Sequence, residues 1–416
     1  MSTPDLSPLR DRFPALTRTQ GGRPVVFTDA PGGSQVPDAV IEAVAGYYRG
    51  GISNSSGAFA TSREADATVA AARDAGADLV GADPDQIMFG PNSTTLLLHL
   101  SRSFARTLSP GDEVVVTRLD HDANIRPWVL AARDAGATVR WVDLRAEDGT
   151  LDLESFEAAL SERTRLVAFT LASNALGTIT PAGELVARAK AAGALVAVDG
   201  VHLAQHRAID LHALGADILA VSPYKVFGPH LGMLAVRRDL LQDWDPYRLR
   251  PTDGYAPPLR WETGTPNFEG LAGFVAAGEY LADVGRTFAV PVQDARSAAV
   301  RAAYDVISGH EDALSLRFLE GLARIDAVRL YGIADPGRVA ERTPTFALRL
   351  GAQAPAQTAE ALGDRGIFVW DGHYYAMELF ERLELLGSGG AVRIGFCHYS
   401  TPAEVDRVLE TLADLA

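Results

Sequence analysis

The stretch from Ile218 to Gly232, ILAVSPYKVFGPHLG, places a lysine just after an apolar run. Lysine is rare in this chain, since Lys190 and Lys225 are the only two and the remaining long basic side chains are arginines. A lysine amine can lose its proton and form an imine, whereas an arginine guanidinium stays protonated. Lys190 lies in ELVARAKAAG, a predicted helix flank where arginine would serve equally well. Lys225 is therefore the candidate for chemistry.

Further polar side chains follow other predicted strands. In open α/β sheets, ligands bind at the carboxyl ends of the strands, so we expect these side chains to meet at one edge. They are His121 after VVVTRL, Asn174 after LVAFTLA, Asp199 at the end of ALVAVD, and Ser93-Thr94 opening a helix after DQIMFG. Each of them alone is a common turn, capping or core residue.

Together these residues suit one cofactor, pyridoxal phosphate. Lys225 would form its Schiff base, and Asp199 would keep the pyridine nitrogen protonated so that the ring can act as an electron sink. Ser93 and Thr94 offer a helix N-terminus with hydroxyl groups, which suits a phosphate. The ring of His121 would stack on the pyridine.

The elements that carry these residues predict an α/β protein. Short apolar strands alternate with helical segments over the first 285 or so residues, which is typical of a mostly parallel sheet covered by helices. After that, a long helical region precedes AVRLYG, TPTFALRLG, GIFVWDG and VRIGF, which predicts a smaller α+β domain. The predicted divisions are an N-terminal segment packing near the small domain (1–24), a large domain beginning with the strand VVFTDA (25–285) and a small domain (286–416).

The totals of the chain exclude several classes of protein. A formal charge of −15 over 416 residues disfavours nucleic acid and anionic membrane surfaces as partners. No apolar run reaches the roughly 18 residues of a membrane span, and no secretory signal is evident. Cys397 is the only cysteine, so an internal disulfide and a multi-cysteine zinc site are excluded. We expect a cytoplasmic location and no metal site.

Six segments, in order along the chain, carry a resemblance to a known family. They are RDRFPAL…VVFTDAPGGSQVPDAVIEAV, LDHDANIRPW, SNALGTITP, VDGVHLAQHRAIDLHALGADILAVSPYKVFGPHLGML, WETGTPNFEG and VRIGFCHYSTPAEVDRVLETL. They resemble the class V aminotransferase family, in its cysteine desulfurase-like branch of fold-type I pyridoxal-phosphate enzymes. The resemblance spans nearly the whole chain. It implies a large domain with a mostly parallel seven-stranded sheet covered by helices, and a smaller α+β C-terminal domain.

The resemblance also implies how the cofactor is held. Lys225 forms the Schiff base, Asp199 pairs with the pyridine nitrogen, and His121 stacks on the ring and takes part in catalysis. The phosphate is held by Ser93, Thr94 and Ser222.

Three further roles concern the substrate and a second subunit. Asn174 lies near the cofactor's phenolic oxygen or the substrate carboxylate. Arg393 binds the α-carboxylate of an amino-acid substrate, a task suited to a planar bidentate donor. Thr265 reaches the phosphate of the neighbouring subunit, so we expect a homodimer.

The chain departs from the family where desulfurases carry their nucleophile. Those enzymes attack the substrate sulfur with a mobile cysteine, but the corresponding segment here, WDGHYYAMEL, has Tyr375 at that position. Cys397 falls in the strand segment that carries Arg393, and we expect it to be a packed core thiol.

Other departures lie close to the cofactor. His202 stands where the family usually has glutamine, and Tyr224 stands where it often has histidine. We expect both to contact the cofactor, and His373 and Tyr375 to contact the substrate.

These departures leave the reaction open. We favour a lyase-type β-elimination, for example of a C–S bond, because it requires no cysteine. Epimerisation or racemisation, as in the isopenicillin-epimerase-like neighbours, needs a second acid or base, for which the candidates are Tyr224, His202, His373 and Tyr375. Reprotonation on the cofactor would give an aminotransferase. A non-catalytic regulator is disfavoured because no DNA-binding module accompanies the fold.

Overall fold

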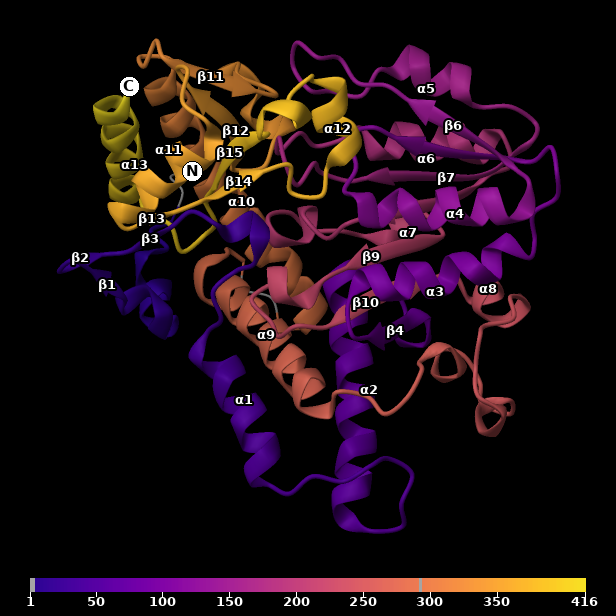
Figure 1. The fold of residues 1–416 in the computed structure, drawn as a ribbon. Helices are drawn as coiled ribbons and strands as arrows, with labels where there is room; N and C mark the ends of the chain where they lie inside the picture. Colours follow the sequence, from indigo (N-terminus) through magenta and orange to yellow (C-terminus); the bar gives the residue numbers. More distant parts are fainter. Residues whose placement is uncertain (1–3, 292–293) are drawn as a thin grey trace.

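The computed structural model describes residues 4–291 and 294–416 (Figure 1). Residues 1–3 of the predicted N-terminal segment and residues 292–293 of the predicted small domain lie outside these ranges. A seven-stranded sheet and a four-stranded sheet organise the described chain. No helix within these ranges is long and apolar enough to cross a lipid bilayer.

The larger sheet has the strand order β4-β10-β9-β8-β7-β5-β6. Its strands are β4 (Ile87–Gly90), β5 (Glu113–Thr117), β6 (Thr138–Val142), β7 (Thr164–Thr170), β8 (Leu195–Asp199), β9 (Ile218–Val221) and β10 (Gly232–Val236). Neighbours from β9 to β6 pair in parallel, and β10 is antiparallel to both β4 and β9. The predicted fold-type I architecture, with a mostly parallel sheet, is confirmed.

Helices cover both faces of this sheet, which is why its strands are continuous apolar runs. Alternate strand residues enter two separate cores, with Val115 and Val167 in one and Val114 and Leu166 in the other. The first core is completed by α2 (Ala60–Val80), α5 (Leu153–Ala159), α6 (Ala182–Ala191) and α9 (Phe268–Phe288). The second is completed by α3 (Ser93–Ala105), α4 (Arg126–Ala135) and α8 (Arg238–Asp243).

The smaller sheet is antiparallel, with the strand order β11-β12-β15-β14. Its strands are β11 (Val328–Tyr331), β12 (Thr345–Leu350), β14 (Trp370–Gly372) and β15 (Ala391–Gly395). It packs with α10 (Arg296–Leu322), α11 (Pro355–Asp364) and α13 (Pro402–Leu415) around a core of its own. Figure 1 shows this orange and yellow unit beside the larger sheet.

The strand expected over residues 25–30 is shorter and does not join the large sheet. It is β3 (Val26–Phe27), which pairs in parallel with β13 (Ile367–Phe368). The physical reason is packing, because Val26 lies in the core of the smaller unit beside Ile367. The bounds 1–24, 25–285 and 286–416 for the three divisions stay a prediction.

The described part of the N-terminal segment contacts both units. Arg10 forms a two-pronged ion pair with Glu404 of α13, with N–O distances of 2.9 Å. The ring of Phe13 packs 5.1 Å from that of Tyr399, and Arg12 pairs with Asp283 of α9. This segment therefore bridges α13 and the loop after β15 to α9 of the larger unit.

Candidate active site

Two adjoining cavities lie at the carboxyl ends of β5, β7, β8 and β9. The inner cavity is lined by Ser93, Thr94, His121, Asn174, Asp199, His202, Ser222, Tyr224 and Lys225, among others. The outer cavity, of about 810 Å³, shares Thr94, His121, Asn174, Tyr224 and Lys225 and adds His373, Tyr375 and Arg393. The site residues predicted from sequence therefore meet here, with the exception of Thr265.

Lys225 is buried just beyond the end of β9, with 7% of its surface exposed. Burial and, to a smaller extent, the nearby charge of Arg393 lower the pKa of its amine to about 8, although Asp199 opposes the change. Such an amine is far more often neutral, and hence nucleophilic, than an ordinary lysine.

Asp199 ends β8 and is also buried. Its Oδ1 accepts a hydrogen bond of 2.8 Å from the backbone N–H of Val201, which fixes the carboxylate at the cavity wall. Burial raises the pKa of this carboxyl, while the hydrogen bond and the charge of Lys225 lower it. A cationic ring nitrogen in the cavity would be the partner that this carboxylate suits.

His121 follows β5 and presents its ring to both cavities. Its Nδ1 accepts a hydrogen bond of 3.0 Å from the backbone N–H of Ala123, so the proton of the neutral ring lies on Nε2. Burial lowers the pKa of His121 to about 3, with smaller contributions from Lys225 and Arg393. The ring is therefore an uncharged planar surface, which suits stacking.

The N-terminus of α3 opens at the inner cavity and carries the hydroxyl groups. Ser93 Oγ donates to the carbonyl of Val221 at 2.6 Å and lies 2.8 Å from Ser222 Oγ. The helix can approach β10 this closely because Gly232 has no side chain, since a Cβ there would lie 2.1 Å from the carbonyl carbon of Asn92. The free N–H groups of a 13-residue helix together with these hydroxyls suit a phosphate.

Arg393 of β15 reaches the outer cavity from the smaller unit. Its Nη1 donates to the carbonyl of Asn174 at 2.9 Å, and its guanidinium lies 4.4 Å from the centre of the Tyr374 ring. Asn174 Nδ2 in turn donates to the carbonyl of Tyr374 at 3.0 Å. Arg393 Nε and Asn174 Oδ1 have no partner within residues 4–291 and 294–416. Burial lowers the pKa of Arg393 to about 10. The guanidinium thus keeps a free Nε–H, which suits a carboxylate.

Tyr375 and His373 lie on the loop after β14, over the outer cavity. Tyr375 is 67% exposed, and its ring lies 5.5 Å from that of His121. Its carbonyl accepts a hydrogen bond of 2.8 Å from the backbone N–H of Asp122. Tyr374 and Tyr375 have φ of 50° and 59°, a left-handed conformation that is uncommon for residues other than glycine. The loop is thus held in a specific turn at the cavity mouth.

Tyr224 and His202 complete the inner cavity. The Tyr224 ring stacks on His230 at 4.9 Å, and burial raises the pKa of its hydroxyl. His202 is 2% exposed, and its Nε2 lies 3.1 Å from the hydroxyls of both Thr343 and Thr345. Both residues line the inner cavity, where the cofactor is expected.

Cys397 and Thr265 lie elsewhere. Cys397 is fully buried after β15, and burial raises the pKa of its thiol well above the ordinary value. It is absent from the linings of the inner and outer cavities described above. Thr265 lines a third cavity beside Glu262 and His99.

Some residues of the site were missed by the sequence analysis. Tyr374 supports Arg393 and holds Asn174, and its place in WDGHYYA was the available signal. Asp120 lies behind His121, accepts from Asn124 at 2.7 Å and has a pKa raised to about 8 by burial. No spacing in the sequence connects Thr343 with His202, because 141 residues separate them.

The residues present fit pyridoxal phosphate. The inner cavity brings together four groups: the amine of Lys225 with its lowered pKa, the buried carboxylate of Asp199, the neutral ring of His121 and the helix N-terminus that carries the hydroxyl of Ser93. The arrangement could hold the cofactor's aldehyde carbon, ring nitrogen, ring face and phosphate, respectively.

Comparisons with known proteins agree with this fit. A family model described as Aminotransferase class-V matches residues 26–408. A cysteine desulfurase from Pectobacterium atrosepticum is 33% identical over 97% of this chain and 96% of its own length. A probable cysteine desulfurase from Mycobacterium leprae is 33% identical over 97% of this chain and 95% of its own.

Solved structures of similar proteins give the same result. A cysteine desulfurase from Thermococcus onnurineus, in its apo form, superposes with a TM-score of 0.86 at 27% identity and covers 100% of this chain and 98% of its own. The cysteine desulfurase CsdA from Escherichia coli superposes with a TM-score of 0.83 at 25% identity, covering 99% of this chain and 98% of its own.

Proposed function

The chain belongs to the class V aminotransferase family of pyridoxal-phosphate enzymes, and on that premise we propose that it eliminates a β-substituent from an amino acid without a cysteine nucleophile. When bound, pyridoxal phosphate supplies an electron sink for bonds that break at Cα. The residues of the chain then determine which bond breaks and where protons go.

The observation that carries the proposal is the position of Cys397. The similar proteins are named cysteine desulfurases, yet the one thiol of this chain is fully buried and has a pKa well above the ordinary value. A thiol in this state is a poor nucleophile, and it lines neither the inner nor the outer cavity. Tyr375 lies over the cavity mouth at the position where the relatives' pattern predicts the cysteine.

Lys225 is the proposed covalent anchor of the cofactor and, once released, the base that removes the Cα proton. A pKa near 8 suits both tasks, since the amine can be neutral when it attacks and can hold a proton afterwards. Asp199 would keep the ring nitrogen protonated, and His121 would stack on the ring.

The remaining predicted contacts orient the two ligands. Ser93, Thr94 and Ser222 would hold the phosphate at the N-terminus of α3. Arg393 would bind the substrate α-carboxylate, with Asn174 beside it, because both residues line the outer cavity. The outer cavity of about 810 Å³ leaves room for a side chain beyond Cβ.

Epimerisation is the second candidate. It is favoured by His373 and Tyr375, which are titratable groups at the outer cavity. Amino transfer to a 2-oxo acid is the third. A homodimer and a cytoplasmic location stay predictions.

The experiment is a screen of amino acids with purified holoenzyme, in which released 2-oxo acid and ammonia, deuterium exchange at Cα and amino transfer are measured separately. We expect 2-oxo acid and ammonia from a substrate with a β leaving group. We also expect Cys397→Ala to retain turnover within about twofold, because packing alone is lost. Stoichiometric persulfide on the protein after incubation with cysteine would contradict the proposal, as would loss of turnover in a folded, cofactor-bound Cys397→Ala variant.

A further inference from the structure

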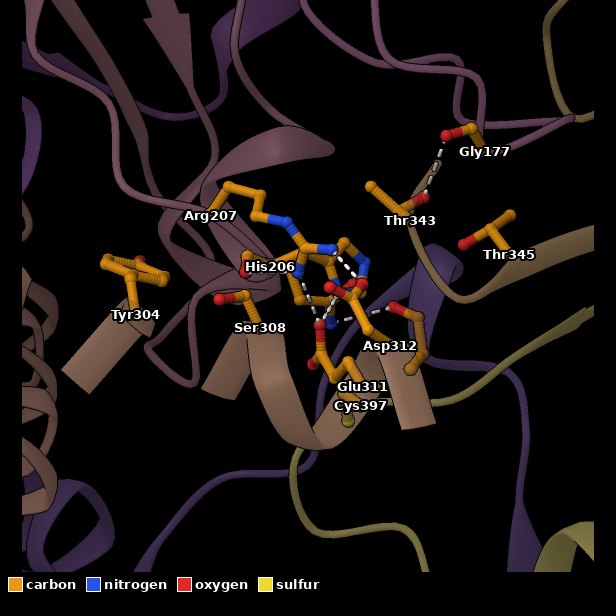
Figure 2. Close-up of polar contacts among 12 residues, drawn as sticks. Gly177, His206, Arg207, Tyr304, Ser308, Glu311, Asp312, Thr343, Thr345 and Cys397 are labelled. Carbon is orange, nitrogen blue, oxygen red and sulfur yellow. Dashed lines mark hydrogen bonds and ion pairs between the residues drawn. The ribbon is translucent and has the colours of Figure 1, made fainter. Parts of the chain in front are cut away.

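The proposed elimination makes no use of two groups of side chains close to the site. The first is a buried polar cluster, in which His206 Nδ1 lies 2.9 Å from Glu311 Oε2 of α10 and Arg207 pairs with Asp312 (Figure 2). These four residues are absent from the linings of the inner and outer cavities. The cluster therefore connects α10 with the segment after β8 and contributes nothing to a ligand in either cavity. The second group consists of exposed aromatic rings at the outer cavity.

Trp370 lies beside Arg393 at this cavity. The two residues are directly opposite each other in the antiparallel pair of β14 and β15. Their side chains therefore leave the sheet on the same face, with Cβ atoms about 4.5–5.5 Å apart. Trp370 is 52% exposed, and its indole packs on Gly32, where a Cβ atom would lie 2.5 Å from Trp370 Nε1. An exposed indole thus borders the predicted site of the α-carboxylate.

Tyr375 presents a second exposed ring to the same cavity. Its ring lies 5.5 Å from that of His121 and 6.2 Å from that of His373. The carbonyl of Tyr375 accepts a hydrogen bond of 2.8 Å from the N–H of Asp122, and its own N–H donates to His373 Nδ1 at 3.2 Å. These bonds hold the residue in a left-handed conformation that is unfavourable for a bulky side chain. The ring is therefore held at the cavity mouth by the turn rather than by burial.

The charged side chains of the outer cavity do not select an ion as the β-substituent. Besides Lys225 and Arg393, the cavity is lined by one guanidinium, of Arg126, and by two carboxylates, of Asp122 and Asp371. Arg126 and Asp371 are exposed, so the solvent screens their charges. The mixed signs and the screening leave the apolar rings as the groups that distinguish one substituent from another.

The two rings suit a planar apolar group. Large apolar side chains are stabilised by burial, and aromatic rings by offset or edge-to-face contact with other rings. An aryl group that entered the outer cavity would supply both to Trp370 and Tyr375. The volume of about 810 Å³ lies within the range of about 300–1,000 Å³ that is usual for pockets of drug-sized ligands, and a cysteine thiol needs far less.

We propose that Trp370 and Tyr375 bind an aromatic β-substituent, so that the preferred substrates are amino acids with an aryl group joined to Cβ through sulfur. The inference rests on the proposed function, because it names the leaving group of that elimination. The Cα proton passes to Lys225, and the Cβ–S bond breaks with its electron pair on sulfur. The aryl thiolate takes up a proton, and one water hydrolyses the remaining enamine to 2-oxo acid and ammonia, without net oxidation or reduction.

S-phenyl-L-cysteine and S-methyl-L-cysteine are the matched substrates for a kinetic test with holoenzyme. The ratio of their kcat/KM values in a variant, divided by the same ratio in the unaltered enzyme, cancels the different reactivity of the two leaving groups. We expect Trp370→Ala and Tyr375→Ala each to lower the preference for the phenyl compound about fivefold, because a ring contact is lost. Tyr375→Phe keeps the ring and should keep the preference.

Met377→Ala is the control for these variants. Met377 is also an exposed apolar residue, but it lies outside both cavities, so the preference should not change. Equal losses with both substrates in Trp370→Ala and Tyr375→Ala would overturn the inference.

Binding of unreactive carboxylates separates the inference from the reaction. 4-Phenylbutanoate has chain atoms in the places of Cα, Cβ and sulfur of S-phenyl-L-cysteine, and it has neither an amine nor a leaving group. Butanoate lacks the ring. In calorimetry with holoenzyme we expect the phenyl compound to bind at least about tenfold more tightly, because the ring is buried. Trp370→Ala and Tyr375→Ala should each reduce this advantage about fivefold.

The outcomes of the binding test are distinct. If the advantage and its loss in the variants appear although no substrate is eliminated, the proposed function is wrong and the aromatic site is supported. Equal binding of the two carboxylates, or an advantage that both variants keep, would refute the aromatic site. Rings that served only contact between subunits would give the latter result together with weaker dimers in light scattering.

Discussion

Lys225 differs from Lys190 by its environment rather than by its type. Lys190 lies on α6, is about one-third exposed and pairs with Asp217, whereas Lys225 is buried between a cation and a carboxylate. Burial disfavours the charged amine and Arg393 repels it, so the pKa falls to about 8 although Asp199 opposes the change. Of the two lysines of this chain, Lys225 is therefore the one whose buried amine can lose its proton near neutral pH.

We predict that the rate of covalent attachment of pyridoxal phosphate to the cofactor-free protein rises with pH and is half-maximal near pH 8. The neutral amine is the nucleophile, so reactivity is gained as the pH rises through the pKa of Lys225. Arg393→Gln removes a repelling charge and should move the midpoint upward, while Asp199→Asn should move it downward. Stopped-flow absorbance gives the rates.

Lys190→Arg is the control for this experiment and should leave the midpoint unchanged, because Lys190 lies outside both cavities. Borohydride reduction followed by peptide mass spectrometry should place the label on Lys225 alone. Label on Lys190, or a midpoint near the ordinary lysine value of about 10.4, would contradict the assignment.

At the scale of elements, the short segment before β12 ties the two units together. Arg342 is fully buried and has no carboxylate partner among the described residues, and its guanidinium lies 4.0 Å from the centre of the Phe346 ring. It donates to the carbonyls of Thr345 at 2.5 Å and Leu176 at 3.3 Å, and also to that of Ile333. The Leu176 contact holds the loop that carries Asn174, so one arginine positions part of the outer cavity.

We predict that Arg342→Met lowers the free energy of unfolding by at least about 3 kcal/mol, because several buried carbonyls lose their donor at once. Burial lowers the pKa of this guanidinium to about 9, which reflects the cost of burying its charge. The apolar side chain of methionine avoids that cost, but it cannot replace the several N–H donors of the planar guanidinium. Arg349→Met on β12 is the control. Arg349 is only half-buried and donates to the carbonyls of Gly390 and of exposed Ser388, so this change should cost less than about 1 kcal/mol. Equal losses for the two variants in urea unfolding would contradict this account.

For the whole molecule, the sequence was sufficient to predict the site residues that lie at or just after the ends of parallel strands. His121, Asn174, Asp199 and Lys225 could be brought together from chain order alone, because parallel strands deliver their carboxyl ends to one edge. Contacts between the two units could not be predicted in this way. No local periodicity encodes these contacts, because they join residues far apart in the chain. Examples are the pairing of β3 with β13 and the hydrogen bonds between Thr343 and His202 and between Arg393 and Asn174.

Thr265 raises a question at the scale of the assembly, because it lies in a cavity separate from the rest of the site. The predicted role for it is contact with the phosphate in a neighbouring subunit. Large apolar side chains are exposed on α1 (Asp38–Arg49), on the segment after it and on the segment leading to Thr265, namely Ile41, Tyr48, Ile52, Phe59, Tyr247, Leu249, Tyr255 and Leu259. In the predicted homodimer, a neighbouring subunit that receives Thr265 would cover part of this apolar surface.

We predict that two inactive variants restore each other's activity when they are mixed. Lys225→Ala removes the anchor, and Thr265→Glu should repel the phosphate in the partner's site. In an isologous dimer, a mixed pair has one site with both defects and one site with neither. When equal amounts of the two variants exchange subunits freely, half of the dimers are mixed. One of the two sites in each mixed dimer is intact, so about one quarter of the activity of the unaltered protein should return. Activity that stays absent although light scattering shows exchanged dimers would mean that Thr265 serves the site of its own chain.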